Sequence, residues 1–269
     1  MNHLLRELAP LSDAAWSQVS DEAKSRLTNY LAGRRLVDFA GPSGWQHSAY
    51  NLGTSTPIDG PPKVSGVQAR SRRILPLCEL RVPFVLLRAE LDDADRGNED
   101  IDLDPLAEAA VAIALAENQA VFHGYPAASI TGITEASSHD PVHVAGGLEE
   151  FPKFVASGVE RLRLAGVIGP YGLALSSELW TDVVETTEHG GYPLFNHLGR
   201  ILDGGPIVWA PGVEGGVIIS QRGGDFLVDS GQDMSVGYLA HDVTTVTLYL
   251  EESFTFRVTS DDAAVALTL

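Results

Sequence analysis

The 269-residue chain has a single cysteine, Cys78, which excludes an internal disulfide and a metal site built from several thiolates. It has no apolar run long enough to span a bilayer. The chain has 18 basic and 36 acidic residues, which gives a net charge of −18. This charge argues against nucleic acid or anionic membranes as partners of the surface as a whole. Residues 1–7 lack the basic-then-apolar layout of a secretion signal, so we expect a cytoplasmic protein.

The chain also lacks the short motifs of common catalytic and cofactor sites. We find no G-x-S-x-G nucleophile elbow and no G-x-G-x-x-G dinucleotide loop. The segment Arg222–Asp225 has no Lys-Ser/Thr ending, so it is predicted to be a hairpin turn and not a phosphate loop. His189 lies on a Gly-rich loop without an evident catalytic partner, and Cys78 is predicted to be an inert core thiol.

Residues 90–104 contain eight acidic residues and resemble a calcium loop only in part. Asp100, Asp102 and Asp104 match its first three ligand positions, but Pro105 and Val111 stand where a Gly and a bidentate Glu are needed. We therefore predict a solvated acidic turn before a helix N-terminus.

His139 and His143 are four residues apart, a spacing that brings two metal ligands together only on a helix. Pro141 lies between them and disfavours a helix there. We predict an exposed loop, no metal site and no cofactor.

The residues that are present predict many short elements of mixed type. Glycine (27) and proline (15) are spread along the chain as turn signals. Helices are expected at 12–32, 105–122, 149–164 and 176–187, with a further short helix ending near Leu202. Strands are expected at 171–175, 207–209 and 217–221 and through the last third. Because no series of βαβ units is seen, the pattern indicates an α+β fold.

Two of these segments indicate self-association. In the first helix, Trp16, Val19, Ala23, Leu27 and Leu31 make one apolar face behind the N-cap Ser12. Residues 64–87 have the pattern of strand, with Arg70, Arg72 and Arg73 among them, and resemble a long extended hairpin. A two-stranded hairpin is marginal alone, so it needs another surface, such as another subunit. These features favour a structural protein over an enzyme.

Short strings in a fixed order resemble the encapsulins, the shell proteins of bacterial nanocompartments (family 1, linocin/bacteriocin type). They are Leu8–Leu11 with Trp16, Gly33–Asp38, Gly41–Pro42, Gly44–Trp45, Glu79–Phe84, Leu91–Asp93, Arg96–Gly97, Gly169–Tyr171, Gly191–Leu194, Arg222–Phe226, Gly231–Tyr238 and Glu252–Phe256. Their collinearity over residues 8–256 carries the resemblance.

The resemblance implies the fold of tailed-phage major capsid proteins (Hong Kong phage type). It implies an N-terminal helix and arm on the inner face (1–48), an extended loop (49–76), a peripheral domain with a spine helix (77–134 and 225–269) and an axial domain (135–224). It further implies a hollow icosahedral shell, of sixty subunits, that encloses a cargo enzyme such as a dye-decolourising peroxidase or a ferritin-like protein. Changes at Arg72 and Leu75 of the extended loop should then impair assembly more than secondary structure.

The resemblance also implies two functional regions. The first is a cargo-peptide site on the inner wall, which the resemblance assigns by position to Leu27, Tyr30, Leu31, Arg34, Asp38, Val228, Asp229 and Met234. The second is a pore loop, which the resemblance assigns to Glu188, His189, Gly190, Gly191 and Tyr192. For Leu27 and Leu31, packing in the core is the competing interpretation. Ala89 stands where some relatives have a tryptophan associated with flavin, and alanine cannot stack on a flavin ring, so no flavin is expected.

Three interpretations of the function remain open at this point. The chain is a nanocompartment shell, a prophage or viral capsid protein of the same fold, or a bacteriocin or peptidase. Phage capsid precursors carry a long scaffolding segment before the first helix, whereas this chain reaches that helix by about residue 12, which favours the shell. The absence of a nucleophile constellation disfavours the third interpretation.

Overall fold

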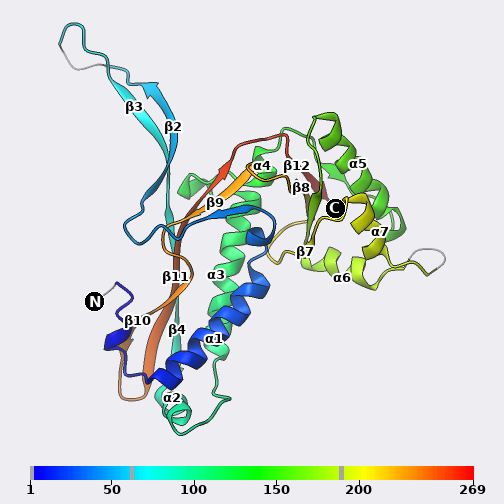
Figure 1. Cartoon of the computed structure of the whole chain (residues 1–269). Helices are drawn as coiled ribbons and strands as arrows, with labels where there is room; N and C mark the ends of the chain where they lie inside the picture. Colours follow the sequence, from blue (N-terminus) through cyan, green and yellow to red (C-terminus); the bar gives the residue numbers. More distant parts are fainter. Residues whose placement is uncertain (1–2, 61–63, 188–190) are drawn as a thin grey trace.

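The chain folds into two five-stranded sheets with helices packed on them and a two-stranded hairpin that projects from the body (Figure 1). The structure is a computed structural model that describes residues 3–60, 64–187 and 191–269. The mixture of elements confirms the predicted α+β class. Within the described residues, no helix is both long and apolar enough to cross a membrane.

The first sheet is built around one long strand. Its strand order is β1-β9-β11-β10, and β4 pairs antiparallel with β11. The strands are β1 (Asp38–Ala40), β4 (Cys78–Leu87), β9 (Phe226–Ser230), β10 (Ser235–His241) and β11 (Thr245–Val258). Phe84 and Leu86 of β4 are buried while Val85 and Leu87 are exposed, the alternation expected of a sheet with one covered face.

Two helices cover this sheet (Figure 1): α1 (Asp13–Tyr30) packs on α3 (Asp104–His123), and α3 contacts β4 and β11. The Ser12 hydroxyl accepts a hydrogen bond from the Ala15 N–H (3.2 Å) and caps α1 as predicted. Val19, Ala23 and Leu27 are buried at four-residue spacing, so the predicted apolar face of α1 is confirmed. The alanine-rich α3 is the predicted buried spine, and Gly124 follows it with a φ of +90°.

The second sheet has the order β5-β12-β8-β6-β7. The strands are β5 (Val142–His143), β6 (Tyr171–Leu175), β7 (Ile207–Trp209), β8 (Gly216–Ser220) and β12 (Ala264–Thr268). The helices packed around it are α4 (Ile133–Ala136), α5 (Phe151–Leu164), α6 (Ser177–Glu185) and α7 (Leu194–Ile201). Short 3-10 turns occupy Arg6–Leu8, Gly33–Arg35, Pro126–Ala128 and Leu148–Glu150. The core of this part includes Phe151, Tyr171 and Leu173, all fully buried.

A hairpin is present as β2 (Ala49–Pro57) and β3 (Arg70–Pro76), which pair antiparallel, in the range of the extended loop that the resemblance implies. The hairpin predicted from the residues ran too far, because residues 78–87 form β4 of the first sheet. The hairpin of β2 and β3 forms a sheet of its own and stands away from the body of the chain (Figure 1). Most of its residues are exposed, so in one copy of the chain the hairpin has almost no packing partner.

Several local predictions were wrong. The segment 222–225 does not close a hairpin, because it joins β8 of the second sheet to β9 of the first. Part of the predicted acidic turn is helical, as α2 (Arg88–Asp95). Strand β12 pairs with β8, so the end of the segment 225–269 lies in the sheet formed by residues of 135–224.

Two single residues also differ from their predicted surroundings. Cys78 is half-buried and not a core residue, and burial raises the pKa of its thiol. His139 is partly buried and its Nε2 lies 2.9 Å from the Asp262 carbonyl oxygen, so only His143 is exposed as predicted.

Candidate functional site

A groove of about 560 Å³ runs along α1 where this helix faces the start of β10. Its apolar lining comes from three parts of the chain: the N-terminal segment, one face of α1, and the strands β10 and β11. The apolar residues are Leu4, Ala23, Leu27, Leu31, Met234, Val236 and Leu250. A groove of this volume with an apolar lining suits a short extended peptide or a small apolar ligand.

The N-terminal segment forms one wall of the groove because it is fixed at several points. The Leu4 carbonyl accepts a hydrogen bond from the Tyr238 N–H of β10 (2.8 Å). The Arg6 guanidinium lies 4.0 Å from the centre of the Trp16 ring and donates to the Ser20 hydroxyl (3.1 Å). This wall is therefore built by residues that precede α1.

Positive charge borders the groove. Arg6, Lys24, Arg34 and Arg35 all line it, and Asp233 is its one acidic residue. Lys24 and Arg35 are exposed. The groove therefore offers an apolar floor and a basic rim, on a chain whose net charge is −18.

Arg34 lies at one end of the groove and is held by a buried acidic cluster. Its guanidinium donates to Glu117 of α3 (Nε to Oε2, 2.9 Å), to Asp233 (Nη1 to Oδ1, 2.6 Å) and to Glu252 of β11 (Nη2 to Oε2, 2.9 Å). The side chains of Glu117 and Glu252 are at most 1% exposed. One cation thus joins the helix α3, the strand β11 and the loop before β10.

Keeping all three carboxylates charged around a single guanidinium costs free energy, because their negative charges repel one another. Burial, followed by repulsion from Glu117, raises the pKa of Glu252 well above its ordinary value, although Arg34 opposes the shift. Glu252 therefore holds a proton that an exposed glutamate would lose. Its Oε1 has no hydrogen-bond partner in the described part of the chain.

The structure brings together half of the residues predicted for a peptide site. Leu27, Leu31, Arg34 and Met234 line the groove, and Tyr30, Asp38, Val228 and Asp229 do not. The Tyr30 ring packs edge-on against Trp209, and Val228 is buried in β9. Asp229 lies 2.6 Å from His47 Nε2.

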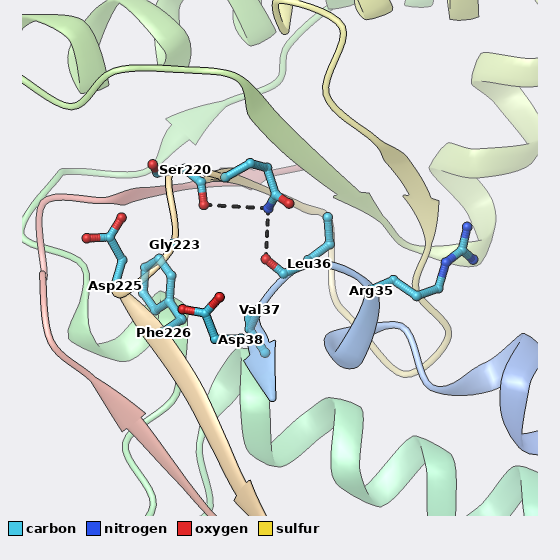
Figure 2. A pocket seen from close by; sticks show the side chains of 9 residues that line it. Arg35, Leu36, Val37, Asp38, Ser220, Gly223, Asp225 and Phe226 are labelled. Carbon is cyan, nitrogen blue, oxygen red and sulfur yellow. Dashed lines mark hydrogen bonds between the residues drawn. The ribbon is translucent and has the colours of Figure 1, made fainter. Parts of the chain in front are cut away.

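Asp38 lies at a separate, much smaller cavity of about 90 Å³ between the two sheets (Figure 2). Its Oδ2 accepts a hydrogen bond from the Gly224 N–H (2.5 Å). In the same cavity Gln221 Nε2 donates to the Leu36 carbonyl (2.8 Å) and to the Ser220 carbonyl (3.5 Å), and Figure 2 shows these bonds as the dashed lines that end at Leu36 and Ser220. Asp38 therefore ties β1 to the connection between β8 and β9.

Sequence reasoning missed several groove residues. Lys24 lies seven residues before Leu31 on the same helical face, so the spacing could have indicated it. Glu117 directly follows the eight apolar residues 109–116 of α3, and an acid at that place on a buried helix is a signal of a buried partner. Nothing in the sequence indicated that Leu4 and Arg6 fold back onto α1.

The other candidate sites stand as follows. Glu188, His189 and Gly190 of the predicted pore loop lie outside the described residues, whereas Gly191 has a φ of +78° and Tyr192 lies 5.2 Å from the Arg200 guanidinium carbon. Among residues 3–60, 64–187 and 191–269, no three His, Cys, Asp or Glu side chains are grouped as a metal site would require.

Solved structures identify the fold as that of capsid-type shell proteins. A virus-like particle from Pyrococcus furiosus matches with a TM-score of 0.63 and 15% identity, over 93% of this chain and 98% of that one. The capsid of Myoviridae phage XM1 matches with a TM-score of 0.52 and 10% identity, over 88% and 90% of the two chains. At such identities the likeness shows the fold alone.

The chain belongs to the encapsulin shell protein family. The family described as "Encapsulating protein for peroxidase" matches residues 1–255. Type 1 encapsulin shell proteins are 48% identical in Rhodospirillum rubrum (99% of this chain, 96% of that protein) and 45% identical in Rhodococcus erythropolis (99% and 100%). The chain is accordingly a structural subunit of a self-assembling shell and not an enzyme.

Proposed function

We propose that the groove along α1 binds an extended peptide of a cargo enzyme and so retains this enzyme inside the shell. The supporting observation is the apolar groove with a basic rim, lined by Leu27, Leu31, Arg34 and Met234 of the predicted peptide site. An extended peptide can place alternate side chains on such a floor while its remaining side chains face the interior.

The cargo is proposed to be a peroxidase. The description of the family, "Encapsulating protein for peroxidase", supports this choice over a ferritin-like protein. Because a shell must close around cargo that is already made, the compartment is proposed to assemble in the cytoplasm, from about sixty copies of the chain.

We propose that each of the two sheets forms the centre of one domain. The sheet around β11, with α1 and α3, would be the peripheral domain, and the sheet around β8 the axial domain with the pore loop at 188–192. Strand β12 then belongs to the axial domain, although it closes the chain.

Co-expression with a tagged cargo tests the groove. The probe is a fluorescent protein that carries the C-terminal segment of a dye-decolourising peroxidase encoded in the same genome. Thr28 is exposed and lines the groove, so Thr28→Trp fills it without burying a polar group. We expect at least about a tenfold drop in fluorescent protein per shell.

The matched control is Ser25→Trp, an exposed position of α1 outside the groove. It should load cargo as the unchanged shell does. Equal loading of the two variants would contradict the assignment of the groove, and failure of the unchanged shell to load the probe would contradict the peroxidase cargo.

A further inference from the structure

The last residue of α3, His123, joins this helix to two neighbouring segments. We define the β7–β8 loop as residues 210–215, which connect β7 to β8. The His123 ring is bonded both to α4 and to this loop: its Nδ1 is 3.1 Å from the Thr134 hydroxyl oxygen, and its Nε2 is 3.0 Å from the Glu214 backbone nitrogen. Because the ring is partly buried and bonded on both sides, its protonation state affects both contacts.

The hydrogen bonds fix which ring nitrogen carries the proton. The Glu214 N–H can only donate, so the Nε2 of His123 is its acceptor and holds no proton. The Thr134 hydroxyl donates to the Phe122 carbonyl (2.9 Å), so its oxygen is available to accept from the Nδ1 N–H of His123. His123 is therefore neutral in this arrangement, with its one ring proton on Nδ1.

A second proton on the ring removes one of these bonds. An imidazolium carries N–H on both nitrogens, so Nε2 can no longer accept from Glu214. Two carboxylates lie near the ring: Glu214 on the β7–β8 loop, and Glu135 of α4, which lies against Gly124 directly after His123. Burial lowers the pKa of His123, and the charge of Glu214 opposes this shift. The bonded arrangement therefore loses stability as the pH falls below the ordinary histidine value of 6.5.

Two side chains of α3 hold the β7–β8 loop at different points. Asn118 donates to the Pro211 carbonyl near the start of the loop (3.0 Å), and His123 accepts from Glu214 near its end. Asn118 is fully buried and has no group that titrates, so a change of pH leaves the start of the loop attached. The end of the loop depends on His123 for its hydrogen bond to α3.

The same end of the loop forms the wall of a further cavity, of about 520 Å³, at the start of α6. Residues 212–215 all line this cavity, opposite the first residues of α6. The Gly215 carbonyl accepts a hydrogen bond from the N–H of Ser176, the residue whose side chain caps α6 (2.9 Å). Release of the loop from α3 therefore changes the shape of the cavity and loosens the start of α6.

We propose that His123 is an acid-sensitive switch: a second proton on its ring releases the end of the β7–β8 loop from α3 and opens the cavity at α6. The switch is built into the fold of the single chain, and it does not depend on the groove along α1 or on a cargo. Histidine changes its charge between about pH 5 and 8, so mild acid is sufficient to operate the switch.

Hydrogen exchange followed by mass spectrometry tests the switch on the purified full chain. The protection factor corrects for the pH dependence of the exchange chemistry, and it is measured for fragments that cover the β7–β8 loop at about pH 7.5 and about pH 5. We expect the loop to lose protection at least about threefold at the lower pH, while fragments from the middle of α3 keep theirs. A loop that is equally protected at both pH values would overturn the inference.

Two variants assign the effect to one histidine. His123→Gln keeps an oxygen that accepts from the Glu214 N–H but has no group that titrates, so the protection of its loop should not depend on pH. His143→Gln is the matched control, because His143 is exposed and its Nδ1 lies 2.7 Å from the hydroxyl of Thr268, which also lines the cavity. It should lose protection as the unchanged chain does. Loss of protection in acid that persists in His123→Gln, or that disappears in His143→Gln, would contradict the assignment to His123.

Discussion

At the scale of single residues, Arg34 holds the candidate groove in place. It was expected to contact a bound peptide, but its guanidinium already bonds to three carboxylates from three elements. A cation so engaged fixes the shape of the groove end. In the proposed peptide complex we expect Lys24 and Arg35, whose side chains are exposed at the rim, to contact the peptide.

Removal of the Arg34 charge should destabilise the subunit. Arg34→Leu leaves Glu117 and Glu252 buried without a cation, which costs about 3–5 kcal/mol. Arg35→Leu, at the exposed neighbouring position, should stay within about 0.5 kcal/mol. Urea unfolding followed by tryptophan fluorescence measures both, and similar midpoints for the two variants would show that the buried cluster does not need Arg34.

Glu252 should make stability depend on pH. Its pKa in the folded chain lies well above the ordinary value of 4.5, so the folded chain binds a proton that the unfolded chain releases as the pH rises past 4.5. The free energy of unfolding therefore falls from that pH up to the raised pKa. Glu252→Gln has no proton to release, so its stability relative to the unchanged chain should rise with pH above 4.5. A difference that stays constant across this range would show that Glu252 is charged in the folded chain.

At the scale of elements, local patterns predicted helices well and strand partners poorly. The spacing of Val19, Ala23 and Leu27 was sufficient for α1, because helix formation depends on neighbours in the sequence. Placing β12 beside β8 requires a pairing between Val265 and Ile218, about fifty residues apart, which no local alternation reveals. The groove could not be predicted for the same reason, because its wall depends on the hydrogen bond from the Tyr238 N–H to the Leu4 carbonyl, between residues far apart in the sequence.

The hairpin is the element whose exposed apolar residues we expect to serve assembly and not the fold of the subunit. Val67→Ser with Ile74→Ser removes two exposed apolar side chains from it. We expect a normal circular dichroism spectrum and a large loss of shells, because we propose that these side chains become buried between copies when the shell assembles. Val184→Ser, at a comparably exposed position of α6, is the control. Loss of secondary structure in the hairpin variant would show that the hairpin supports the subunit itself.

At the scale of the whole molecule, one chain combines a groove with a hairpin that projects from its body. The groove lies along α1, and the hairpin of β2 and β3 forms a sheet of its own. The resemblance in short strings predicted the family, and the capsid-type fold agrees with it. The groove and the paired strands of the hairpin bring together residues distant in sequence, so their shape became visible only in the folded chain.

The central claim is that this chain builds a closed shell, and electron microscopy of the purified protein after size-exclusion chromatography tests it most directly. A shell of sixty subunits of 28.7 kDa has a mass in the megadalton range. We predict uniform hollow particles that elute accordingly. A folded chain that remains a monomer or dimer at several salt concentrations and pH values would contradict the account.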